Sequence, residues 1–131
     1  MLHSRVVIVG AGHAGGSAAA FLRQYGHTGK IVLIGDEPLL PYQRPPLSKA
    51  WLKGEADAES LQLKPSSWYE EAGVFLRLGG VVTSIHRGAK TVTLASGEDL
   101  PYDHLILATG ARARALPIPG ADLSEIGRAH V

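Results

Sequence analysis

The chain has 131 residues, no cysteine, and 13 lysines and arginines against 12 acidic residues, which gives a formal net charge of +1. This near-neutral balance gives no support for a nucleic-acid partner or for binding to an acidic membrane surface. The absence of cysteine excludes a disulfide scaffold, a thiolate zinc site and a redox-active dithiol in this sequence, and we expect no metal site.

The length is sufficient for one domain with a hydrophobic core. No apolar run reaches the length of a membrane span, and residues 1–5 lead directly into a predicted strand. We therefore expect a cytoplasmic protein that has no signal peptide and no membrane partner.

The first elements in the chain predict a βαβ unit. Residues 5–9 are rich in β-branched side chains and end at Gly10, as in a buried strand. Residues 14–25 (AGGSAAAFLRQY) are small and apolar and stop at Gly26, which is typical of a helix. Residues 31–34 form a second buried strand. A parallel pair with a right-handed crossover follows from this order.

A proline-rich segment, GDEPLLPYQRPPLSKAWL, occupies residues 35–52. Residues 47–52 are expected to form one or two helical turns opened by Pro46. Residues 53–65 are polar and are expected to be irregular. A short helix is predicted over residues 66–72, with Ser66 or Ser67 as its N-cap and Glu70 as the capping-box partner.

The second half of the sequence is rich in strands. Residues 74–78 predict a strand, residues 81–86 and 91–94 a strand pair around a turn, and residues 102–108 a buried strand that ends in Thr109 and Gly110. Residues 117–120 are expected to be an exposed connector. The predicted fold class is α/β, a Rossmann-like domain with a parallel sheet and a small antiparallel β-flap inserted before the last parallel strand.

The loop Gly10-Ala11-Gly12-His13-Ala14-Gly15 matches G-x-G-x-x-G between a strand and a helix. In this context the glycines allow a tight turn, close approach of a pyrophosphate and packing of the helix on the strand. The phosphates would bind free N–H groups at the positive end of the helix. Asp36, or its neighbour Glu37, ends the second strand where a carboxylate binds the ribose of an adenine nucleotide. The motif alone leaves FAD and NAD open.

Three segments carry a resemblance to a known family: VVIVGAGHAGGSAAAFLR, IVLIGDEPLLPYQRPPLSKAWL and YDHLILATGARARALPIPG. Together they resemble the FAD-dependent ferredoxin reductases of bacterial oxygenase systems, a group that includes putidaredoxin, rubredoxin and aromatic-ring dioxygenase ferredoxin reductases. The resemblance covers residues 5–120, and the P-Y-x-R-P-P-L-S-K string is its most specific part. Apoptosis-inducing factor carries a similar string, so the resemblance does not select one activity.

The resemblance implies a set of FAD-binding residues. The glycine loop would hold the pyrophosphate, Asp36 and Glu37 the ribose, and the backbone of Val82 the adenine. Arg44 and Lys49 would reach the flavin side, where an ammonium group stabilises the negative charge of a reduced flavin. The full set implied to bind FAD is Gly10, Ala11, Gly12, His13, Ala14, Gly15, Asp36, Glu37, Arg44, Lys49, Val82, Thr109 and Gly110, with Lys49 as the catalytic residue.

The implied activity is NAD(P)H-dependent electron transfer through FAD to a small iron–sulfur protein, a ferredoxin or rubredoxin, in an oxygenase system. Because no cysteine pair follows the proline-rich loop, electrons are expected to leave for an external acceptor. The enzyme alternatives are the flavin subunit of a nitrite reductase and an NADH oxidase. A signalling or structural protein like apoptosis-inducing factor is an alternative of another class. The sequence does not distinguish NADH from NADPH.

Members of that family are about three times longer, with a second glycine-rich βαβ for NAD(P)H, a later Gly-Asp motif and an interface domain. We therefore expect residues 1–123 to be the N-terminal part of the FAD-binding domain, incomplete by itself, with weak flavin binding and no NADH oxidation. Residues 126–131 can be back-translated to a common sequencing-adapter oligonucleotide. Residues 124–131 are therefore expected to be a non-native tail.

Overall fold

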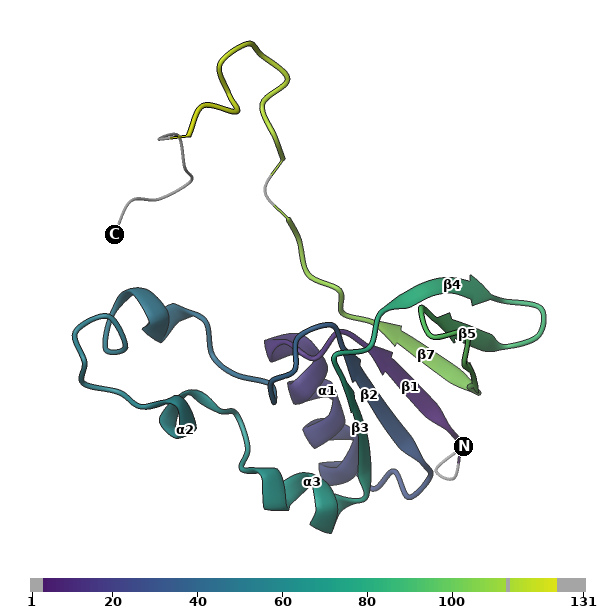
Figure 1. Cartoon of the computed structure of the whole chain (residues 1–131). Helices are drawn as coiled ribbons and strands as arrows, with labels where there is room; N and C mark the ends of the chain where they lie inside the picture. The colour runs from purple at the N-terminus through teal and green to yellow at the C-terminus, as the bar shows by residue number, and fades with distance from the viewer. Residues whose placement is uncertain (1–3, 113, 125–131) are drawn as a thin grey trace.

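The computed structural model describes residues 4–112 and 114–124 (Figure 1). The glycine-loop unit consists of β1 (Val6–Val9), α1 (His13–Gln24) and β2 (Ile31–Gly35). The middle of the chain contains η1 (Pro45–Ser48), α2 (Ala58–Leu61), α3 (Ser66–Ala72) and β3 (Val74–Leu78). The remaining strands are β4 (Val82–His86), β5 (Thr91–Leu94), β6 (Asp99–Pro101) and β7 (His104–Leu107).

Four strands form a parallel sheet in the order β3-β2-β1-β7. Val6 of β1 pairs with Ile31 of β2 on one side and with His104 of β7 on the other. The predicted βαβ unit, the strand at residues 74–78 and the return of the last strand to this sheet are thereby confirmed. The carboxyl ends of β1, β2 and β7 meet at one edge, which is where doubly wound sheets bind ligands.

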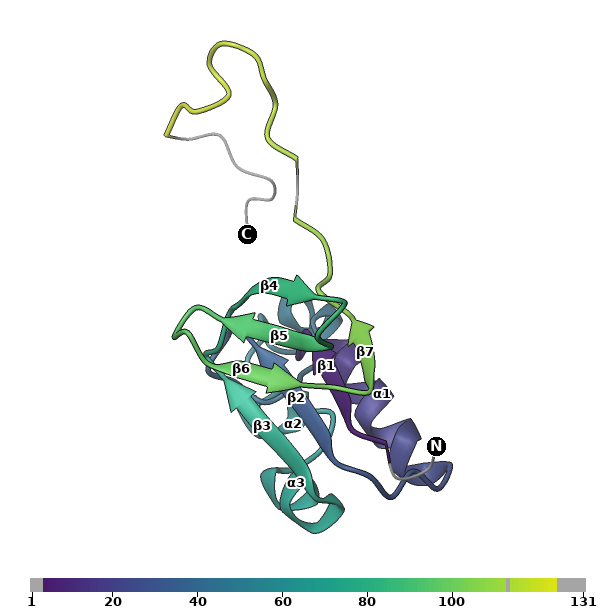
Figure 2. The same ribbon diagram turned by 90° about the vertical axis from the view of Figure 1, so that its right-hand side faces the viewer.

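The two faces of the sheet are covered by different layers, because side chains alternate along each strand. On one face Ile8 and Leu33 pack against Ala19 of α1 and Tyr69 of α3. On the other face the strands pack against Val92 and its neighbours in the second sheet. Figure 2 shows this second sheet stacked over the parallel one.

The second sheet is antiparallel, with the order β4-β5-β6, and confirms the predicted flap with its strand pair β4 and β5, to which it adds β6, a strand that was not predicted. Its position is tied to β3 by Arg77, which forms a bidentate ion pair with Glu98 in the turn between β5 and β6. The hydrogen bond between the two side chains, with the charge of Glu98, raises the pKa of Arg77 above its usual value. This exposed ion pair links the flap to β3 at the surface, while the buried contacts of Val92 and Leu94 hold the flap on the sheet.

The packing of the flap gives a stability prediction. Val92 is fully buried between the two sheets, whereas Val81 is 48% exposed. Val92→Ala is expected to lower the free energy of unfolding by about 2 kcal/mol, because two buried methyl groups are lost and a cavity remains. The matched change Val81→Ala is expected to cost less than about 0.5 kcal/mol. Urea unfolding of both variants measures the difference, and equal costs would contradict the packing of the flap.

Several details differ from the sequence-based expectations. The last strand was predicted to be buried, but β7 is an edge strand of the sheet and Leu107 in it is 59% exposed. Residues 53–65 contain a short helix, α2, whose N-cap Asp57 accepts a hydrogen bond from the N–H of Ser60 at 2.8 Å. Helix α3 is capped by Pro65 without a side-chain hydrogen bond, so the predicted capping by Ser66 or Ser67 was wrong. The proline-opened turns are a 3₁₀ helix, which begins at Pro45.

After β7 the chain leaves the sheet and runs outward in both views (Figures 1 and 2). Leu116, Ile118 and Leu123 are more than half exposed there, in agreement with an exposed connector at residues 117–120. The expected non-native tail lies outside the described residues from position 125 onward. In the described ranges, none of the helices has the length and apolar character needed to cross a lipid bilayer.

Candidate functional site

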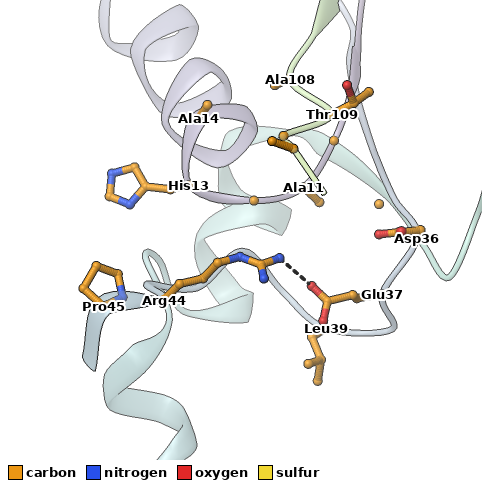
Figure 3. A pocket seen from close by; sticks show the side chains of 15 residues that line it. Ala11, His13, Ala14, Asp36, Glu37, Leu39, Arg44, Pro45, Ala108 and Thr109 are labelled. Carbon is orange, nitrogen blue, oxygen red and sulfur yellow. Dashed lines mark hydrogen bonds and ion pairs between the residues drawn. The ribbon is translucent and has the colours of Figure 1, made fainter. Parts of the chain in front are cut away.

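A cavity of about 580 Å³ opens at the carboxyl ends of β1, β2 and β7 (Figure 3). Its size is within the range of small-molecule and cofactor sites. Three segments meet around it: the glycine loop before α1, the proline-rich loop after β2, and the chain that follows β7. The lining residues are Gly10, Ala11, Gly12, His13, Ala14, Gly35, Asp36, Glu37, Leu39, Arg44, Pro45, Ala108, Thr109, Gly110 and Ala111.

The glycine loop forms the floor of the cavity and the start of α1. Gly12 is the N-cap residue and provides no side-chain hydrogen bond to the helix. The first N–H groups of a helix have no partner within it, and the helix dipole makes them attract anions. A Cβ placed on Gly12 would have no atom within 4 Å, so space is available beside these donors. The loop therefore fits a pyrophosphate group.

The acidic edge of the cavity consists of Asp36 and Glu37, directly after β2. Asp36 is exposed and makes no hydrogen bond or ion pair with the other described residues, which leaves both of its oxygens available to ribose hydroxyls. Glu37 is already engaged. Its Oε1 lies 3.3 Å from Nη2 of Arg44, the contact drawn in Figure 3. Asp36 is therefore the better placed of the two for a ribose.

The proline-rich loop is fixed to α1 by a contact between distant parts of the sequence. Pro41 is fully buried, and a Cβ on Gly16 of α1 would lie only 2.7 Å from Cβ of Pro41. Leu63 supports the same contact, since its N–H donates to the carbonyl of Pro41 at 3.0 Å. Arg44 lies further along this loop. Its side chain therefore reaches the cavity from a loop that is packed against α1 at Pro41.

The structure brings most of the predicted site residues together but leaves three outside the lining. Gly15 lies behind the loop, where α1 meets β1. Val82, in β4, packs against the core between the sheets. Lys49 follows η1, and its Nζ donates a hydrogen bond of 3.4 Å to the carbonyl of Pro45, which itself lines the cavity.

Five lining residues were missed by the sequence reasoning. They are Gly35, Leu39, Pro45, Ala108 and Ala111. Each of them is close in the sequence to a predicted site residue. Their positions near the carboxyl ends of β2 and β7 could therefore have indicated that they line the cavity. Gly35 also carries a packing signal, since a Cβ there would lie 2.5 Å from Cβ of Ala11. Its lack of a side chain lets the glycine loop pass over the end of β2.

Comparisons with known proteins agree with this geometry. The family model described as pyridine nucleotide-disulphide oxidoreductase matches residues 4–130. The probable ferredoxin reductase CtmF of Castellaniella defragrans is 48% identical over 128 residues, which cover 98% of this chain and 31% of that protein. Rhodocoxin reductase of Rhodococcus erythropolis is 52% identical over 121 residues, covering 92% of this chain and 28% of the relative. The chain thus spans 28–31% of the length of these relatives.

Two solved structures share the fold at high identity. The ferredoxin reductase from Rhodopseudomonas palustris superposes with a TM-score of 0.84 at 47% identity, covering 93% of this chain and 30% of that one. Putidaredoxin reductase, in its covalent complex with putidaredoxin, gives a TM-score of 0.82 at 47% identity, covering 89% of this chain and 28% of that one.

Proposed function

The chain belongs to the pyridine nucleotide-disulphide oxidoreductase family, and from this membership we propose that it is the FAD-binding portion of an NAD(P)H-dependent flavoprotein reductase. In this proposal residues 1–123 form the N-terminal part of the FAD-binding domain, the protein is cytoplasmic, and a ferredoxin or rubredoxin accepts the electrons in an oxygenase system. The names of the relatives support this acceptor class, since they include reductases of ferredoxin, rhodocoxin and rubredoxin.

One observation carries the proposal: an open glycine loop, an available carboxylate and an arginine line the same cavity. The loop from Gly10 to Gly15 would bind the pyrophosphate through N–H groups, and Asp36 would accept hydrogen bonds from the adenosine ribose. Thr109 and Gly110 would close the opposite side. FAD, when bound, would accept a hydride and release single electrons.

Two further residues complete the proposed site. Arg44 offers a planar set of donors suited to phosphate, and it already lies at the cavity. Lys49 would place an ammonium charge beside the flavin, where it would stabilise the reduced form. Lys49 does not line the cavity itself, but its Nζ contacts the carbonyl of Pro45, which does. Val82 is proposed to contact the adenine through its backbone, at the start of β4.

The proposal is tested by cofactor binding to the full-length protein. We expect a yellow protein with flavin absorbance, and Asp36→Asn is expected to weaken FAD binding about tenfold, because a hydrogen bond to a charged group is worth about 1.5–3 kcal/mol. Glu71→Gln removes a charge from an exposed position of α3 and serves as the control, with unchanged affinity. A colourless protein that binds NAD tightly would refute the assignment of FAD.

A further inference from the structure

Tyr42 lies between two of the charged residues of the cavity without lining it. Its hydroxyl lies 3.2 Å from each carboxylate oxygen of Glu37 and donates its single proton to the two in a bifurcated hydrogen bond. Its ring lies beneath the guanidinium of Arg44, with 5.4 Å between the guanidinium carbon and the ring centroid. Because Glu37 and Arg44 also pair with each other, the three side chains form one closed network.

The backbone around Tyr42 is hydrogen-bonded to one neighbouring segment, residues 61–63. Tyr42 pairs with Gln62 in an isolated antiparallel bridge, and the adjacent N–H of Gln43 donates to the carbonyl of Leu61 at 2.8 Å. Arg44, in contrast, has a side chain that is 67% exposed. An exposed arginine samples many rotamers, so its direction depends on the groups that hold it.

The hydroxyl of Tyr42 remains a donor over the physiological pH range. Burial raises its pKa above the usual value of a tyrosine, Arg44 opposes this shift, and the Glu37 carboxylate raises the pKa further. The hydroxyl therefore stays protonated and keeps its hydrogen bond to Glu37. The Glu37 carboxylate, which accepts from Tyr42 and pairs with Arg44, lines the cavity.

We propose that Tyr42 is a positioning residue that holds Arg44 and Glu37 at the mouth of the cavity, so that the guanidinium faces the phosphates of a bound dinucleotide. This inference rests on the proposed function, in which the cavity binds FAD. Tyr42 acts through Arg44, with its ring under the guanidinium and its hydroxyl on the carboxylate that pairs with it.

The test compares two substitutions in the full-length protein. Tyr42→Phe keeps the ring and removes the hydrogen bond to Glu37, and it is expected to weaken FAD binding about threefold. Tyr42→Leu also removes the contact with Arg44, and it is expected to weaken binding about tenfold. Binding is measured by the change in flavin fluorescence. Tyr25→Leu, at an aromatic position that is 76% exposed and far from the cavity, is the control with unchanged affinity.

A double-mutant cycle separates positioning from a general structural role. In an Arg44→Met background, Tyr42→Leu is expected to change the affinity for FAD by less than about twofold, because the group through which it acts is gone. An undiminished effect in that background would overturn the proposal. The cycle is repeated with ADP, so that a protein that binds ADP but not FAD refutes the proposed function while still testing Tyr42. A protein that binds neither nucleotide overturns both.

Discussion

Gly15→Ala is expected to lower the free energy of unfolding by at least about 3 kcal/mol, although alanine ordinarily stabilises a helix by about 1 kcal/mol relative to glycine. Gly15 is buried in the first turns of α1, and a Cβ there would overlap the carbonyl oxygen of Gly10. A backbone carbonyl cannot rotate aside as a side chain can. Helix α1 would have to move away from β1, with loss of the packing of Ala19 against the sheet.

Gly12→Ala is the matched control for this prediction. The two glycines belong to the same motif, but a Cβ on Gly12 would meet no atom within 4 Å, and its φ of −88° is accessible to alanine. Gly12→Ala is therefore expected to cost less than about 1 kcal/mol in stability. Its methyl group would occupy the space beside the free N–H groups, so FAD binding is expected to fall at least about tenfold.

Urea unfolding and flavin binding, measured on both variants, are expected to distinguish them by stability. Gly15→Ala is expected to lose stability and binding together, whereas Gly12→Ala is expected to lose binding alone. If Gly15→Ala stabilised the protein as in an ordinary helix, the close approach of α1 to the Gly10 carbonyl would be contradicted. If Gly12→Ala bound FAD normally, the phosphates would have to lie elsewhere.

The centre of the parallel sheet could be predicted from the sequence because its two central strands, β1 and β2, are continuous apolar runs. Burial on both faces requires such runs, and residues 6–9 and 31–34 contain only valine, isoleucine and leucine. The glycine loop was also predictable, because its glycines and the strand and helix on either side of it are contiguous in the sequence. Asp36 follows from the same pattern, because the end of β2 lies beside the start of α1.

The path of the proline-rich loop and the contacts of Tyr42 depend on residues that are distant in the sequence, and no local pattern predicts them. Pro41 meets Gly16 across the fold, and this contact fixes the direction of the proline-rich loop. The role proposed for Tyr42 depends on the same packing of the loop against α1. Its hydrogen bond to Glu37 could therefore not be derived from the order of residues. The N-cap of α3 was mistaken because Pro65 takes the extended conformation that a capping serine would otherwise adopt.

Gly10→Ala is expected to be the second severe substitution, and its cost has two separable parts. Gly10 has a φ of 115°, a conformation that costs a residue with a side chain about 1–3 kcal/mol. A Cβ there would also overlap the carbonyl oxygen of Ala108, directly after β7, and such overpacking typically costs a further 1–3 kcal/mol or so. The expected total loss is roughly 2–6 kcal/mol.

Gly26→Ala separates these two parts. Gly26 follows α1 with a φ of 94°, but a Cβ there would meet nothing within 4 Å, so only the backbone strain remains. We expect Gly26→Ala to cost about 1–3 kcal/mol and to keep FAD binding. Gly10→Ala should additionally displace the chain after β7, which carries Thr109 and Gly110 at the cavity, and should abolish binding. Equal unfolding costs and equal FAD affinities for the two variants would show that the chain after β7 does not press on the glycine loop.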